Sequence, residues 1–241
     1  IRMFPELLED WPDLFLCRNL KAVAFIPLVA RLRMELCDDL NELHRGGIMS
    51  IVLGFEETAL HNLVIDDKYK NRKDKQDVDI RLFSVLRRLR DMDLIWKLHK
   101  SLLHEVCQQN SLPERRFQFL ANWDPDMFAQ DAWGSIPLHF AAKNSFPIFL
   151  SVFKVGIELF PKKRGINFLF KETCCGNDTP FLYACEKFGS EKVMKAVEDT
   201  LNDCPYDAVD AFVFAAIHDH EISLDGVYFL LHREPDVLHK L

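Results

Sequence analysis

The chain has little glycine and no long apolar run. No run of about eighteen or more apolar residues occurs in its 241 residues, so we expect no membrane-spanning helix. Residues 1–10 lack the charged and then apolar order of a secretory signal. Nine glycines against twenty phenylalanines are typical of a packed helical protein.

The cysteines form no recognisable disulfide or zinc framework. Their number, seven, is odd, and their spacing matches no such pattern. We therefore expect free thiols in a reducing compartment, which predicts an intracellular location in the cytoplasm or nucleus. An organelle is left open because the sequence does not begin with Met. The cysteines are Cys17, Cys37, Cys107, Cys174, Cys175, Cys185 and Cys204.

The chain also lacks the short motifs of common enzymes and a net positive charge. It contains no phosphate-binding glycine loop, nucleophile elbow, kinase motif set or H-E-x-x-H. A formal charge of −7 disfavours nucleic acid as the main partner, because neutralising phosphate requires a basic surface. Residues 218–221 (HDHE) are the densest cluster of metal-ligand types, but we interpret them as a polar loop between two helices. We expect no catalytic residue, no metal and no cofactor.

The most informative stretch is Asp131–Ala142, which reads DAWGSIPLHFAA. Gly134 suits a turn position with positive φ, which strains other residues. Pro137 suits the first helical position, where its missing N–H removes no helical bond. The two alanines at the end favour a helix that a neighbour can approach closely. The stretch therefore predicts a tight turn followed by a helix.

Asp131–Ala142 resembles the core of an ankyrin repeat, D-x-x-G-x-T-P-L-H-x-A-A, and matches it at Gly134, Pro137, Leu138 and His139 among others. Five weaker copies bring the aligned positions to 27, 59, 102, 137, 180 and 211, with offsets of 32, 43, 35, 43 and 31 residues. The whole is similar to divergent ankyrin-like chains that are numerous in unicellular algae. The resemblance implies an all-α solenoid of about six helix-pair repeats with short hairpin loops. It also implies one domain over 1–241 that begins partway through a repeat and whose array is left open at its end.

The resemblance also assigns structural roles to individual motif residues. In the family, the motif histidine bonds to the backbone of neighbouring loops, and this role would fall on His61, His104 and His139. Pro180 occupies the same position as Pro137. Helical stripes are predicted at Leu82, Val85, Leu86 and Leu89, and at Leu224, Val227, Tyr228 and Leu231 after an N-capping Ser223. Residues 66–76 are interpreted as a solvated loop.

Ankyrin-like proteins commonly bind partners at hairpin tips and first helices, and this implies three candidate segments here: Asn19–Ala22, Gln130–Trp133 and Glu172–Cys175. We expect a non-enzymatic protein–protein interaction module or scaffold with a concave repeat surface and an unidentified protein partner. Alternatives are a structural subunit buried in a larger complex and a metal-dependent enzyme. Trp133 is the leading anchor because exposed tryptophans dominate interfaces, although it could instead pack sideways on the adjacent repeat. The candidate contact residues are Lys21, Gln130, Asp131, Trp133, Glu172 and Thr173.

Overall fold

The computed structural model is mostly helical in the part of the chain that it describes. Within those ranges there is no strand, only three isolated antiparallel bridges. None of the helices there combines the length and apolar content needed to cross a bilayer. Lys21, Gln130 and most of the 66–76 segment lie outside the described residues. The described residues are 22–36, 59–65, 75–93, 101–109, 111–129, 131–174, 176, 178–218 and 221–241.

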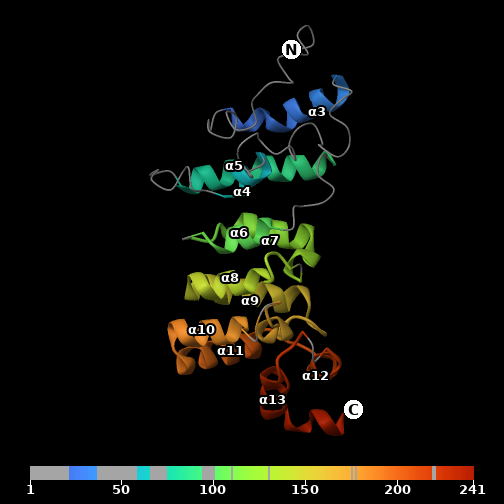
Figure 1. The fold of residues 1–241 in the computed structure, drawn as a ribbon. Coiled ribbons are helices and arrows are strands. Elements are labelled where there is room, and N and C mark those ends of the chain that lie inside the picture. The colour runs from blue at the N-terminus through green and yellow to red at the C-terminus, as the bar shows by residue number, and fades with distance from the viewer. Residues whose placement is uncertain are drawn as a thin grey trace. The chain divides into compact units, whose positions relative to one another are not determined.

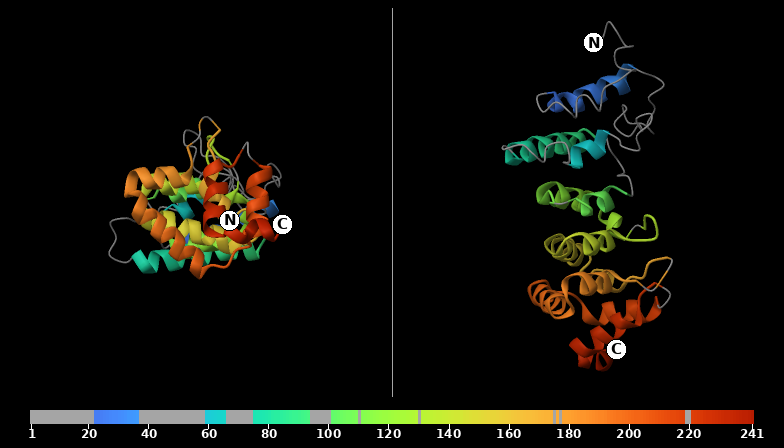
Figure 2. Two further views of the ribbon diagram at one scale, coloured as in Figure 1. Left: turned by 90° about the horizontal axis from the view of Figure 1, so that it is seen from below. Right: turned by 60° about the vertical axis from the view of Figure 1, so that its left-hand side comes forward.

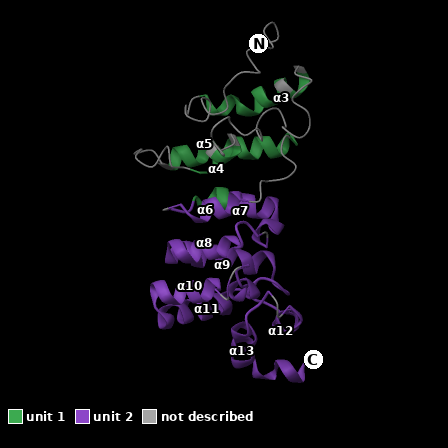
Figure 3. Ribbon diagram, viewed as in Figure 1, with its two compact units in different colours: residues 1–99, 113–117 green, residues 100–112, 118–241 purple. Residues whose placement is uncertain are grey.

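The chain divides into two compact units (Figure 3). Unit 1 comprises residues 1–99 and 113–117, and unit 2 comprises residues 100–112 and 118–241. The helices follow one another along the chain as labelled in Figure 1. They are η1 (Val23–Phe25), α3 (Ile26–Leu36), α4 (Ala59–Val64), α5 (Lys75–Asp91), α6 (Leu102–Cys107), α7 (Glu114–Trp123), η4 (Pro125–Phe128), α8 (Pro137–Asn144), α9 (Phe146–Leu159), η5 (Ile166–Phe170), α10 (Pro180–Phe188), α11 (Ser190–Asp203), α12 (Ala208–Ile217), α13 (Leu224–Arg233) and η6 (Pro235–His239).

The helix starts follow the aligned motif positions. Helices α4, α6, α8 and α10 begin at residues 59, 102, 137 and 180, and α3 begins one residue before position 27. Pro137 and Pro180 open α8 and α10, where a missing N–H costs no helical bond. Helix α12 is the exception, because it begins at residue 208 rather than 211. There the Asp207 side chain accepts from the Asp210 N–H at 3.0 Å and caps the helix early.

In unit 1, α5 provides the central apolar face and contacts η1, α3 and α4. The predicted stripe on α5 is confirmed, because Leu82, Val85, Leu86 and Leu89 are all at most 3% exposed. Burying each such side chain contributes roughly 1.5–3 kcal/mol to folding. Leu63 of α4 is also fully buried. A helix of this length is not stable through its internal hydrogen bonds alone, so tertiary packing stabilises it.

In unit 2, α8 lies between α6 and α10 and also packs against α9, as two further views show (Figure 2). The small residues Ala141 and Ala142 of α8 are fully buried, which lets neighbouring helices approach closely. Helix α9 in turn contacts α11 and η5. The hairpin turn that precedes α8 is therefore attached to the best-packed part of this unit.

The stripe predicted for α13 is wrong. Leu224 and Tyr228 are 65% and 68% exposed, whereas Gly226 and Leu230 are buried. A Cβ on Gly226 would lie 2.8 Å from Cβ of Phe170, so the helix meets η5 through its glycine. Periodicity of large apolar residues misses such a face because the contact point has no side chain. Ser223 does cap α13, accepting from the Asp225 N–H at 3.4 Å.

Candidate functional site

The segment before α8 forms a two-residue hairpin turn, Ala132–Ser135, which we call the hairpin tip. The N–H of Ala132 donates to the carbonyl of Ser135 at 3.0 Å, and the reverse bond is 3.2 Å. Its two central residues, Trp133 and Gly134, have φ of 54° and 77°. Positive φ at both positions is the signature of a type I′ turn, which matches the twist of the flanking backbone.

Trp133 is an unusual residue for this turn. Type I′ turns favour Asn-Gly or Asp-Gly, because asparagine and aspartate tolerate the left-handed region better than bulky residues. For a non-glycine residue this conformation costs roughly 1–2 kcal/mol. The indole is nevertheless 69% exposed, so burial of the ring offsets little of this conformational free energy. Such strain is kept where surrounding structure over-determines it, and it gathers at functional sites.

Two aromatic rings support the base of Trp133. The ring of His104 lies edge-on to the indole at a centroid distance of 6.2 Å, and the ring of Phe140 at 6.0 Å. His104 and Phe140 also contact each other at 5.4 Å. The ring of Trp133 therefore contacts these two neighbours edge-on and leaves most of its surface in solvent.

His104 also fixes the tip through the backbone. Its Nε2 lies 3.0 Å from the Ser135 carbonyl oxygen, which can only accept, so the ring donates this bond. His104 is fully buried on α6, so the tip is tied to a helix that lies 31 residues earlier in the chain. The two ends of the turn, Ala132 and Ser135, are therefore bonded to each other, and Ser135 is also bonded to α6.

His139 lies one turn inside α8 and is fully buried. Its Nδ1 accepts from the Ile136 N–H at 3.1 Å, which satisfies a donor at the start of the helix. Burial lowers the pKa of His139 to about 4, with the Lys143 charge acting in the same direction. The neutral ring is therefore the form that the folded protein accommodates. His61, the third motif histidine, is 4% exposed on α4.

A second turn lies against the hairpin tip. Thr173 and Gly176 form an antiparallel bridge, and the N–H of Cys174 donates to the Gly134 carbonyl at 3.1 Å. A Cβ on Gly134 would collide with Sγ of Cys174, so glycine is required there by contact as well as by φ. The two turns therefore pack backbone to backbone.

An open hollow of about 390 Å³ lies beside these turns and brings together three of the predicted contact residues, Asp131, Glu172 and Thr173. Glu221 also lines it, and its Oε2 accepts from Lys171 Nζ at 2.7 Å. Trp133 is not among the lining residues. The structure thus groups the predicted tip residues that it describes around two neighbouring turns, without merging them into one pocket.

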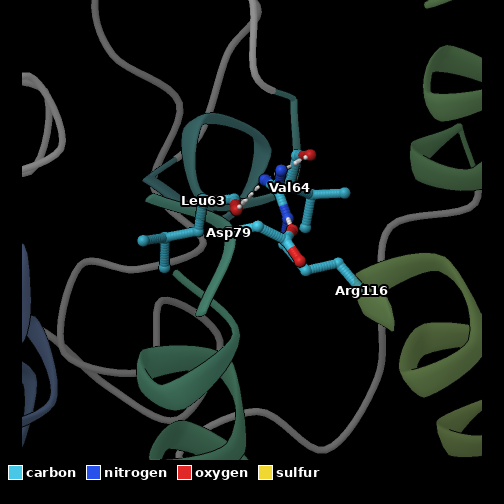
Figure 4. A network of polar contacts seen from close by, with 4 residues as sticks. All are labelled: Leu63, Val64, Asp79 and Arg116. Atoms are coloured by element: carbon cyan, nitrogen blue, oxygen red, sulfur yellow. Dashed lines mark hydrogen bonds and ion pairs between the residues drawn. The ribbon is translucent and has the colours of Figure 1, made fainter. Parts of the chain in front are cut away.

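The strongest polar network in unit 1 was not predicted from the sequence. Arg116 is fully buried, and its Nε donates to Asp79 Oδ1 at 2.7 Å (Figure 4). Its Nη1 donates to the carbonyls of Leu63 and Val64, both at 2.9 Å. These carbonyls end α4, where a positive charge is favourable and where helical partners are missing. Nothing in the sequence around Arg116 distinguishes it from its exposed neighbour Arg115.

The corresponding contact in unit 2 is made by Asn144, the last residue of α8. Its Nδ2 donates to the carbonyls of Cys107 at 3.0 Å and Gln109 at 2.6 Å, at the end of α6. The sequence did not predict this contact. The spacing of the aligned positions is the signal that relates the end of α8 to the end of α6.

The metal-ligand cluster at residues 218–221 is only partly described, because residues 219 and 220 lie outside the described ranges. His218 donates from Nδ1 to the Phe214 carbonyl at 3.0 Å and stacks on the Phe214 ring at 4.1 Å. Among the residues that the structure describes, no group of three or more His, Cys, Asp and Glu side chains is arranged to hold a metal ion.

Comparison of the chain with protein-family models, with curated proteins and with solved structures gave no match in any of the three.

Proposed function

We propose that the chain is a non-enzymatic protein–protein interaction module built from ankyrin-like helix-pair repeats, with Trp133 at the hairpin tip as its main anchor. The observation that carries this proposal is the exposed indole of Trp133 in a strained left-handed conformation. A residue that gains little from burial and costs conformational energy is better explained by binding than by stability.

The hairpin tip is preorganised for binding. His104 and Phe140 hold the base of the indole, and the backbone of the turn is bonded on both sides. A fixed aromatic side chain loses little rotamer freedom when a partner covers it, so more of its contact energy contributes to affinity. Cys107, Cys174, Cys185 and Cys204 are free thiols, which supports an intracellular location as part of the proposal.

The test is capture of partners from native extract with the wild-type chain, followed by measurement of Kd with the purified partner. Trp133→Ala should weaken binding by about 30-fold or more, since truncating a hot-spot residue costs about 2 kcal/mol or more. Tyr228→Ala is the matched control, because Tyr228 is similarly exposed, at 68%, but belongs to helix α13 and not to the hairpin tip. A partner bound equally by wild type and Trp133→Ala would contradict the assignment of the anchor.

Trp133→Asn separates binding from folding. It creates Asn-Gly, the preferred type I′ pair, while removing the same ring contacts as Trp133→Ala. We expect the Asn variant to be more stable than the Ala variant by about 1 kcal/mol in urea unfolding, because asparagine adopts positive φ more readily. Both variants should weaken binding of the partner to a similar extent. Equal stability of the two would show that the backbone strain at residue 133 is negligible.

A second candidate function is that of a structural subunit in a larger assembly. It is favoured by exposed apolar side chains near the C-terminal end of the described chain, Ile217, Leu224, Tyr228 and Leu238, which are 55–68% exposed. Exposed apolar surface of this kind marks interaction sites. The capture experiment distinguishes the two candidates, because a subunit contact through α13 would be lost in Tyr228→Ala and retained in Trp133→Ala.

A further inference from the structure

A second hollow in unit 2 has the character of a small-molecule site. It encloses about 310 Å³ between η5 and α12, at the lower end of the volumes of ligand pockets. Phe168 and Phe214 form its apolar walls, and Arg164, Lys171 and His218 contribute to its polar lining. It is distinct from the hairpin tip, and the inference below does not depend on the proposed partner.

Asn167 lines this hollow and carries an unpaired acceptor. The side chain is 1% exposed, and its Nδ2 donates to the carbonyls of Lys163 at 2.7 Å and Ala211 at 2.9 Å. Because both carbonyls only accept, the orientation of the amide is fixed, and Oδ1 is the atom left over. No described residue donates to Oδ1. A buried acceptor without a donor costs about 1–3 kcal/mol, so its presence points to a donor from a bound molecule.

The charges around the hollow favour an anion. Within the described part of the chain, the guanidinium of Arg164 makes no hydrogen bond or ion pair with another residue. Lys171 also lines the hollow, with its side chain 18% exposed, and its Nζ lies 2.7 Å from Oε2 of Glu221. The lining therefore contains two basic side chains, Arg164 and Lys171, and one carboxylate, that of Glu221. Arginine is well suited to carboxylate and phosphate groups because it can donate two parallel bonds.

We infer that this hollow binds a small organic anion that also carries a hydroxyl group. The anionic group would face Arg164 and Lys171, and the hydroxyl would donate to Asn167 Oδ1. Phe168 and Phe214 would cover the carbon skeleton. A carboxylate and a phosphate meet these requirements equally, so the class includes hydroxy acids and hydroxylated phosphate esters.

The test uses matched probes on the full chain, followed by calorimetry and by the NMR signal of the Asn167 side-chain amide. Malate and succinate are both dianions that differ by one hydroxyl, and glycerol 3-phosphate represents the phosphate esters. We expect malate or glycerol 3-phosphate to bind at least tenfold more tightly than succinate and to shift the Asn167 signal, since a buried acceptor left unpaired penalises the analogue. Equal binding of malate and succinate, or no binding of any probe at 10-fold molar excess over millimolar protein, would overturn the inference.

A pair of charge variants checks the location. Arg164→Gln should weaken binding of the better probe by about tenfold, because one charge-assisted bond is lost. Lys162→Gln is the matched control, since Lys162 is an exposed cation in the same turn that does not line the hollow. Equal weakening by both variants would show that the probe senses only the general charge of the surface. Both positions are exposed, so neither variant is expected to disturb folding.

Discussion

Helices α4 and α6 are both six residues long and both begin at an aligned motif position, yet different side chains cap their ends. In unit 1 the cap is the buried guanidinium of Arg116, and in unit 2 it is the neutral amide of Asn144. A helix this short leaves most of its carbonyls without internal partners, so an external donor is needed in each case. The carbonyls at the end of the helix thus accept from a charged donor in unit 1 and from a neutral donor in unit 2.

The difference between the two caps determines which changes destabilise each unit. A buried cation stabilises carbonyls strongly, but it must itself be neutralised, here by Asp79 at 2.7 Å. Removal of either partner leaves the other group uncompensated. A neutral amide needs no counter-ion, and its hydrogen bonds stabilise the helix end less than those of a charged group do. Unit 2 also contains buried His139, whose Nδ1 accepts from the Ile136 N–H only while the ring is neutral.

The largest effect is expected for Arg116→Ala. It leaves two helix-end carbonyls and the Asp79 carboxylate without their donor, so we expect a loss of about 3–5 kcal/mol in the free energy of unfolding. Urea unfolding measures it. Arg115→Ala removes the same side chain from the adjacent, exposed position and should change stability by less than about 0.5 kcal/mol. A cost near 1 kcal/mol for Arg116→Ala would mean that the charged cap is no stronger than a neutral one.

The next effect concerns acid pH and separates the two units. The pKa of His139 is about 4 in the folded protein, below its ordinary value of 6.5, so the unfolded chain binds the proton more readily. The folded state has its full stability from this group above pH 6.5 and loses it as the pH falls through 4, by about 3 kcal/mol in total. The cap of α4 is made by a guanidinium rather than by an imidazole, so we expect no corresponding loss there.

Hydrogen exchange at pH 7 and pH 4.5, corrected for intrinsic rates, would localise this loss. Protection should fall in α8 peptides more than in α5 peptides. His139→Asn is the control, because its Oδ1 can accept from the Ile136 N–H without titrating. That variant should show a smaller difference between the two pH values. A similar loss of protection in both units, unchanged in the variant, would show that His139 is not the group responsible.

The smallest effect is expected for Asn144→Ala, which removes two neutral bonds at the end of α6. We expect a loss of about 1–2 kcal/mol in urea unfolding, because each neutral bond contributes about 0.5–1.5 kcal/mol. Asn122→Ala is a suitable control, since Asn122 makes one exposed bond within its own helix. A loss as large as that of Arg116→Ala would remove the distinction between charged and neutral caps.

The sequence predicted the positions of helices better than their faces. Turn glycine, helix-opening proline and motif spacing are local signals, and they located the starts of α8 and α10 at residues 137 and 180. The buried face of α13 was missed because Gly226 contacts Phe170 directly, and a missing side chain leaves no trace in an apolar pattern. Ser223, a local capping signal, was predicted correctly.

The site was predicted only in outline. Register placed Asp131, Glu172 and Thr173 at turns, and they line one hollow. The positive φ of Trp133 could not be foreseen, because tryptophan has no preference for it and the paired bonds of the turn impose it. Arg116 and Asn167 depend on carbonyls 44 to 53 residues away, at separations that local patterns do not report.

The bond from Arg116 to Val64 spans 52 residues, and this has a consequence for synthesis on the ribosome. Residues 1–99 leave the exit tunnel first, followed by residues 100–112 of unit 2, and only then by residues 113–117 of unit 1. Until Arg116 emerges, the last carbonyls of α4 have no guanidinium from which to accept a hydrogen bond, and Asp79 lacks its ion-pair partner from α7. Unit 1 is therefore completed only after unit 2 has begun to emerge, and a nascent chain that has emerged as far as residue 112 would present unit 1 without this cap.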